Sequence, residues 1–159
     1  MTALSRIQEG KSKNLIDEVR AGDKEKKKRL PVVCFSGEFS SRADDALFEH
    51  SGFIVLDFDH VDVEATKTAL ATDDYVHSCW VSPSGDGIKA LVQITNTERH
   101  RDHFRALITY FSKQYALEVD ESGINESRAC FESHDVDIII KDEWKKFGAF
   151  SSEHSEAQT

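Results

Sequence analysis

Hydrophobic residues recur along the last two thirds of the chain with two periods, one typical of strands and one typical of helices. The runs FIVLDFD, YVHSCWVS and IKALVQI are short and rich in β-branched and aromatic residues, and they predict strands at 53–59, 75–82 and 88–94. Apolar residues at helical spacing predict helices over 62–72 and 97–117. The turn sequence SPSGDG joins the second and third strands into a hairpin.

The two ends of the chain show weaker patterns. The N-terminal third predicts three short elements, which are a helix over 12–21, a buried strand at 30–37 and a helix over 40–52. Near the other end, SRACFES at 127–133 predicts the last core strand, and the VDIII that follows predicts an extension at the sheet edge. The tail from Ser151 is expected to be disordered.

From Phe53 onward the predicted order is strand, helix, strand, strand, helix, strand. This order is typical of a split β-α-β unit, an α/β (α+β) fold with a four-stranded antiparallel, RRM-like or palm-like sheet backed by two helices. The third strand should lie between the first two, and the fourth beside the first. We therefore expect a small N-terminal α/β extension at 1–50, a core at 51–140 and a C-terminal segment at 141–159.

The composition and the cysteine spacing predict the cellular compartment of the protein. No apolar stretch approaches the ~20 residues that span a membrane, and the first residues lack the apolar core of a secretion signal. The three cysteines are too widely spaced for a zinc pair or a disulfide framework, so we expect a reduced, cytoplasmic protein.

The net charge of −9 argues against nonspecific coating of DNA, but it is unevenly distributed. Residues 11–29 carry eight Lys or Arg and four Asp or Glu, a local charge of +4. Within them, KEKKKR is either a solvated turn or an edge that faces phosphates.

Two carboxylates follow the first predicted core strand. Residues i and i+2 of a strand point to the same face, so Asp57 and Asp59 should lie side by side. Their repulsion would be relieved by a hard divalent cation such as Mg²⁺ or Mn²⁺, and Asp120 could complete the ligand set. The predicted topology brings the end of this strand, the hairpin turn and the loop from Asp120 to Arg128 to one edge of the sheet.

The hairpin sequence SPSGDGIK supplies groups that suit a phosphate. Ser82 and Ser84 can donate hydrogen bonds, Gly85 and Gly87 let backbone N–H groups approach closely, and Lys89 adds a positive charge. Acids for a metal beside such a turn predict a nucleotidyl-transfer site.

Each feature also has a plainer interpretation. The D-x-D could be a surface pair or a helix cap, SGDG an ordinary hairpin turn, the acids around Asp120 a solvated loop, and Arg128 a structural ion-pair partner. His100 and His103 favour an exposed helix face over a zinc site, because no further ligand spacing supports zinc. The joint placement of these residues at one edge of the sheet favours a catalytic site over the plainer interpretations.

The ordered series LPVVCFSGEFSSR, HSGFIVLDFDHVD, VSPSGDGIKALVQI and YALEVDESGINESRACFESHD resembles the VirE N-terminal-type domain, which is similar to the archaeo-eukaryotic primase superfamily. The resemblance spans about residues 29 to 137. It maps the superfamily's acidic motif to Asp57 and Asp59, its small-residue turn to Ser84, Gly85, Gly87 and Lys89, its third motif to Val119 and Asp120, its arginine to Arg128, and its Ser-x-Asp to Ser133 and Asp135. Lys89 stands where the superfamily commonly has histidine.

The resemblance implies a primase-polymerase core that joins nucleotides on a single-stranded DNA template with Mg²⁺ or Mn²⁺. Its substrates would be NTP or dNTP, its context the replication of a mobile element or phage, and its partners a separate helicase or accessory priming domain. Two alternatives remain open. One is a non-catalytic nucleotide- or nucleic-acid-binding module, and the other is a haloacid-dehalogenase-type phosphatase with Asp57 as nucleophile, which would need a parallel sheet.

Overall fold

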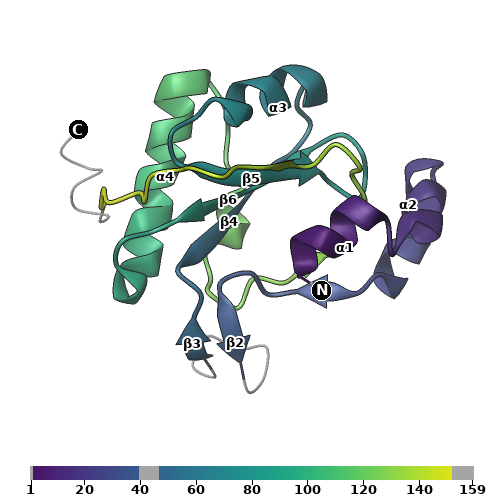
Figure 1. The fold of residues 1–159 in the computed structure, drawn as a ribbon, viewed down its shortest axis with the longest axis horizontal. Coiled ribbons are helices and arrows are strands. Elements are labelled where there is room, and N and C mark those ends of the chain that lie inside the picture. Colours follow the sequence, from purple (N-terminus) through teal and green to yellow (C-terminus); the bar gives the residue numbers. More distant parts are fainter. Residues whose placement is uncertain (1, 40–46, 152–159) are drawn as a thin grey trace.

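A four-stranded sheet forms the centre of the molecule in the computed structural model, which describes residues 2–39 and 47–151 (Figure 1). All neighbouring strands are antiparallel. In spatial order they are β4 (Phe53–Phe58), β6 (Ile88–Gln93), β5 (Val76–Val81) and β8 (Ile139–Ile140). The predicted α+β class with a four-stranded antiparallel sheet is confirmed, as is the place of the third core strand between the first two.

The predicted position of the fourth strand is wrong. Within 127–133, only β7 (Cys130–Phe131) is a strand, and it pairs with β1 (Val32–Val33) in a separate two-stranded sheet. The fourth strand of the central sheet is β8, which lies beside β5 rather than β4. The physical reason is that Cys130 is buried against a face of the central sheet, which removes β7 from its edge.

The two faces of the central sheet are covered differently. Ile54, Leu56 and Phe58 pack with α3 (Val63–Ala71) and α4 (His100–Tyr115), the two predicted backing helices. Val55, Trp80 and Leu91 point to the opposite face, where Ile7 of α1 (Ala3–Glu9) covers them (Figure 1). Asp57 shares the parity of Val55, so its side chain belongs to this second face.

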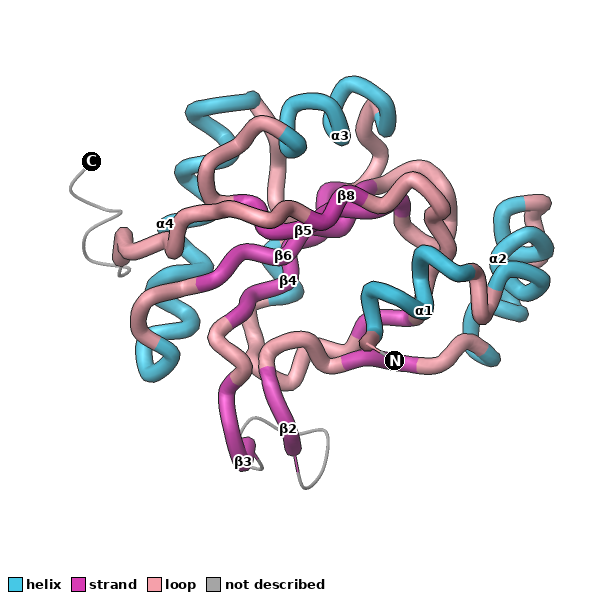
Figure 2. The backbone as a smooth tube through the Cα atoms, in the orientation of Figure 1, coloured by secondary structure: helices cyan, strands magenta, loops and turns pink. Residues whose placement is uncertain are grey.

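The N-terminal extension consists of short elements that wrap the second face. In chain order they are α1, α2 (Lys13–Arg20), η1 (Lys24–Arg29), β1, β2 (Gly37–Phe39) and β3 (Leu47–His50). The helix α1 was not predicted. The helix predicted over 40–52 is wrong at its C-terminal end, because β3 pairs there with β2 as a ribbon that projects from the body (Figure 2). Residues 40–46 of the predicted helix lie outside the described part of the chain.

The histidines of α4 are not exposed, contrary to the prediction. His100 and His103 are 3% and 0% exposed. His103 accepts a hydrogen bond from the backbone N–H of Asn96 and contacts the carbonyl of Ala149 at 2.7 Å, so it fastens the C-terminal segment to the helix.

The C-terminal segment packs on the core up to the last described residues. Phe147 is 4% exposed and bridges to Ile94, and the Trp144 indole donates to Gln93. The tail expected to be disordered lies, after Ser151, outside the described residues. Among the helices that are described, none has the length and apolar character needed to cross a membrane.

A buried carboxylate anchors the start of β5. Asp73 is 4% exposed, and its oxygens accept hydrogen bonds from the backbone of Tyr75 and Val76 and from the hydroxyls of Tyr110 and Tyr115. Burial, together with the bond to Asp73, raises the pKa of Tyr115 to about 12, so its hydroxyl stays a donor at neutral pH.

We expect Asp73→Ala to lower the free energy of unfolding by about 2 kcal/mol, because it leaves buried donors without an acceptor. Urea unfolding measures this effect. The neighbouring Asp74→Ala is the control, because the side chain of Asp74 is exposed and, among the described residues, makes a single surface pair, with Lys145 at 3.5 Å. Equal losses in the two variants would contradict the role of Asp73.

Candidate functional site

The site begins with a cross-strand pair on the second face of the sheet. Asp57 in β4 and Lys89 in β6 are direct register partners, so their side chains leave the sheet on the same side. Lys89 Nζ lies 2.5 Å from Asp57 Oδ1, and the two side chains are only 12% and 6% exposed. Burial alone would lower the pKa of Lys89, but the charge of the Asp57 carboxylate and its hydrogen bond hold it above its ordinary value.

Arg128 completes a three-membered charge cluster around Asp57. Its Nη2 donates to Asp57 Oδ2 at 3.0 Å, so each oxygen of this carboxylate faces a cation. The Nε of Arg128 is buried and has no hydrogen-bond partner among the described residues. Burial raises the pKa of the adjacent Cys130 thiol, so this group is neutral at neutral pH and Asp57 is the anion that Lys89 and Arg128 share.

The hairpin turn closes over the end of β4 because of its glycines. A Cβ at Gly87 would lie 2.8 Å from the carbonyl oxygen of Phe58, so only glycine allows this approach. Gly85 has φ of 87°, in the region that favours glycine. The N–H of Gly87 donates to Ser82 Oγ, and the Ser82 and Ser84 hydroxyls lie 3.2 Å apart.

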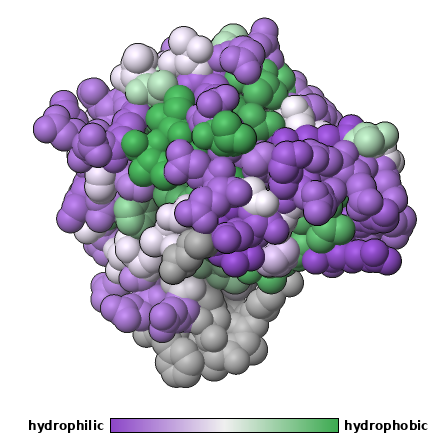
Figure 3. All heavy atoms as spheres, turned by 45° about the vertical axis from the view of Figure 1, so that its right-hand side comes forward, coloured by the Kyte–Doolittle hydropathy of each residue, from purple (hydrophilic) through white to green (hydrophobic). Residues whose placement is uncertain are grey.

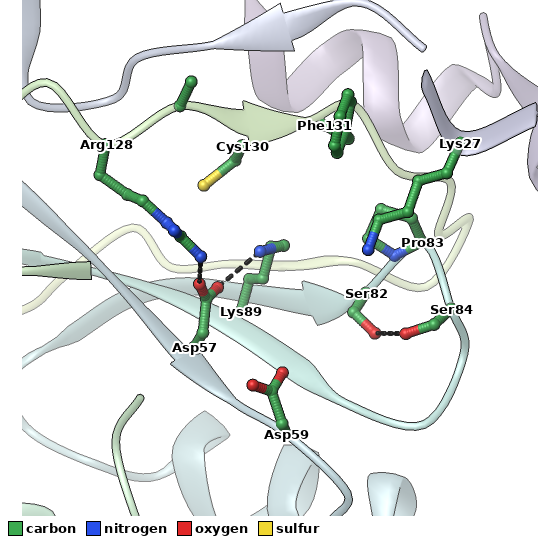
Figure 4. A pocket seen from close by; sticks show the side chains of 11 residues that line it. Lys27, Asp57, Asp59, Ser82, Pro83, Ser84, Lys89, Arg128, Cys130 and Phe131 are labelled. Carbon is green, nitrogen blue, oxygen red and sulfur yellow. Dashed lines mark hydrogen bonds and ion pairs between the residues drawn. The ribbon is translucent and has the colours of Figure 1, made fainter. Parts of the chain in front are cut away.

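The charge cluster and the two serines line a cavity of about 360 Å³, which lies between the sheet and the β1–β7 ribbon (Figure 4). Six of the predicted site residues are brought together there, namely Asp57, Asp59, Ser82, Ser84, Lys89 and Arg128. Asp59 is exposed, and its carboxylate faces this space from just beyond β4. Three cations and two acids line the cavity, because Lys27 reaches it from η1.

Three predicted residues do not line the cavity. Gly85 and Gly87 shape the turn instead of presenting N–H groups to a ligand. Asp120 lies on the expected edge, where its N–H donates to the carbonyl of Asp57, but its Oδ1 accepts from the N–H and hydroxyl of Ser122. Burial alone would raise the pKa of Asp120, but the hydrogen bonds from Ser122 and the charges of Arg128 and Lys89 hold this pKa below its ordinary value.

Sequence reasoning missed Lys27 and Phe131 as lining residues. Lys27 Nζ lies 5.8 Å from the centre of the Phe131 ring, on the opposite wall from Asp59 (Figure 4). The only signal for Lys27 was the KEKKKR run, for which a phosphate-facing edge was one interpretation.

Ser133 and Asp135 support the site from outside the cavity. Ser133 Oγ donates to the carbonyl of Val81, and Asp135 accepts from the N–H of Val81 and pairs with Lys67 at 2.7 Å. These bonds fix the end of β5, from which the hairpin turn leaves. The Ser-x-Asp motif therefore positions Ser82 rather than contacting a ligand in the cavity.

The donor set fits a hard cation only in part. Within the described ranges, no three His, Cys, Asp or Glu side chains are placed to hold a metal, and the set of Asp57, Asp59 and Asp120 stays a prediction. Mg²⁺, however, is commonly held by one or two carboxylates together with substrate phosphates. Asp57 and Asp59 fit that requirement, provided that the ion pairs of Asp57 with Lys89 and Arg128 break when the ion binds.

Comparison with known proteins identifies a family for most of the chain. Residues 25–139 match the family described as "BT4734-like, N-terminal domain". The matched range includes all the residues that line the cavity. Neither the curated proteins nor the solved structures give a match. The family description states no activity, so function has to be argued from the site.

Proposed function

We propose that this chain, which belongs to the BT4734-like N-terminal domain family, is a primase-polymerase-type nucleotidyltransferase core. The observation that carries the proposal is the single cavity in which Asp57 and Asp59 face Lys89, Arg128 and Lys27 beside two serine hydroxyls. Paired acids opposite phosphate-binding cations are the arrangement that metal-assisted transfer of a nucleotide requires.

The roles follow from the chemistry of the side chains. Lys89 and Arg128 would bind the triphosphate, and the buried Nε of Arg128 offers a donor that no described residue uses. Ser82 and Ser84 would donate hydrogen bonds to phosphate oxygens. Asp57 and Asp59 would hold Mg²⁺ or Mn²⁺, and the ion would supply charge stabilisation for the attacking and leaving oxygens. The template would be single-stranded DNA and the substrate NTP or dNTP, with any helicase or priming domain supplied separately.

A second candidate is a non-catalytic nucleotide-binding module. It is favoured by the charge cluster itself, because both oxygens of Asp57 are already paired and Asp120 is turned to Ser122. The phosphatase alternative is disfavoured, because it needs a parallel sheet and the strands of the central sheet are paired antiparallel throughout the described part of the chain.

The decisive experiment is incorporation of labelled nucleotides on single-stranded DNA at low salt, with Mn²⁺ and with Mg²⁺. Extension or synthesis of oligonucleotides supports the transferase. Nucleotide binding without any incorporation in either metal overturns it and supports the binding module.

Lys89→Ala should weaken nucleotide binding at least ~10-fold, because it removes a charged phosphate contact. Isothermal titration with a non-hydrolysable nucleotide measures the change. Lys67→Ala is a matched control, because Lys67 is also 12% exposed and also pairs with an aspartate, but outside the cavity. If both variants bind nucleotide as the wild type does, Lys89 does not contact phosphate.

A further inference from the structure

A basic surface on the N-terminal extension is not explained by the nucleotide site. Another cavity, of about 450 Å³, lies where α1 and α2 meet the segment before β1. Its charged lining residues are all cations, namely Arg6, Lys11, Lys13 and Arg29, and Ser12 and Asn14 add polar groups. We call these six residues the N-terminal basic surface. In Figure 3, which turns the side carrying α2 forward, hydrophilic side chains dominate this part of the molecule.

The positive charge of this surface is available to a ligand. Arg29 is exposed and forms no ion pair with a described residue. Within 2–39 and 47–151, Lys11 and Lys13 pair only with exposed acids, Glu9 at 3.7 Å and Asp17 at 2.5 Å. Exposed pairs of this kind contribute little, so a phosphate can replace the acid. Arg6 is committed to Glu132, and this pair fixes α1 next to β7.

The basic surface is close to the nucleotide site. Arg29 and Lys27 both belong to η1, and Arg29 lines one cavity while Lys27 lines the other. Two residues of a 3₁₀ helix advance by only about 4 Å, so the two cavities flank the same short segment. Positive charge therefore runs from Lys13 past Arg29 to Lys27 and the Phe131 ring. A cationic track beside an aromatic ring is typical of surfaces that bind single strands.

We propose that the N-terminal basic surface binds the phosphate backbone of single-stranded nucleic acid and directs that strand along η1 to the nucleotide cavity. The inference rests on the proposed function in one respect, since it takes the bound strand to be the template. It accounts for a chain with net charge −9 that concentrates a charge of +4 within residues 11–29. The local field attracts a polyanion although the whole molecule would repel it.

The test compares two triple variants with the same change in charge. Lys11→Gln, Lys13→Gln and Arg29→Gln together remove the exposed cations of the basic surface. Lys113→Gln, Lys145→Gln and Lys146→Gln together remove three exposed cations that line neither cavity. Fluorescence anisotropy with a labelled oligothymidylate gives affinity at several salt concentrations, and binding of a fluorescent nucleotide is measured on the same proteins.

We expect the basic-surface variant to lose at least ~10-fold in affinity, and the salt slope to fall by about 2, for three lost contacts on a single strand. The control should change less than twofold, and both variants should bind nucleotide normally. Equal losses in the two variants would show a net-charge effect and overturn the inference. Competition by duplex DNA or by phosphatidylserine vesicles as strong as that by oligothymidylate would also overturn it.

The proposed function fails by a different result. Loss of incorporation with retained strand binding would leave the basic surface in place and remove only the transferase. Normal incorporation with unchanged strand binding in the basic-surface variant would leave the transferase in place and remove the basic surface as the strand-binding site.

Discussion

Asp57→Asn is expected to reduce nucleotide incorporation by at least ~10²-fold, the size of effect seen when a main electrostatic stabiliser of a transition state is removed. The substitution keeps the size of the side chain but removes the negative charge that a divalent cation needs. Incorporation of labelled nucleotide on single-stranded DNA, at saturating Mn²⁺, measures the loss.

Asp57 also holds two cations, so a variant at a second acid must separate chemistry from folding. Asp59 is exposed and lines the same cavity, and Asp59→Asn should lose incorporation while keeping the stability of the wild type. Asp62→Asn is the control, because it changes the charge three residues away and keeps a good helix cap for α3. Full incorporation by Asp59→Asn would remove this residue from the chemistry.

The parts of the fold that were predicted correctly are those with a strong period. The β5–β6 hairpin alternates between its two faces, and α4 repeats apolar residues at helical spacing, so neighbouring residues alone determine these elements. The placement of Asp57 and Lys89 at one edge of the sheet was predicted from the strand order, which puts β6 between β4 and β5. Their direct pairing across β4 and β6 was not predicted.

Long-range contacts that leave no local period were not predicted. The strands β1 and β7 have two residues each, and their pairing depends on burial of Cys130. The arrival of Lys27 in the cavity depends on that pairing. The bonds that Asp120 Oδ1 accepts from the N–H and hydroxyl of Ser122 were equally hidden, because they involve a loop without a periodic pattern.

Without metal, Asp57→Asn is expected to strengthen the binding of triphosphate, whereas with metal it should reduce incorporation. In the folded protein Asp57 competes with any phosphate for Lys89 and Arg128, since both cations point at its oxygens. Removing its charge should lower the free energy of unfolding by about 3 kcal/mol, because two partly buried cations lose their shared anion. The same change should raise the affinity for metal-free inorganic triphosphate about tenfold, equivalent to about 1.4 kcal/mol.

Urea unfolding in EDTA, with and without inorganic triphosphate, measures both effects. Triphosphate should restore much of the stability that Asp57→Asn loses, because its oxygens supply the missing negative charge to Lys89 and Arg128. Asp135→Asn is the matched control, because Asp135 is also buried and paired with a lysine, at 2.7 Å, but outside the cavity. Asp135→Asn should lower the free energy of unfolding, and triphosphate should not restore it. Rescue of both variants alike, or of neither, would show that the cations of the Asp57 cluster are not the phosphate-binding groups.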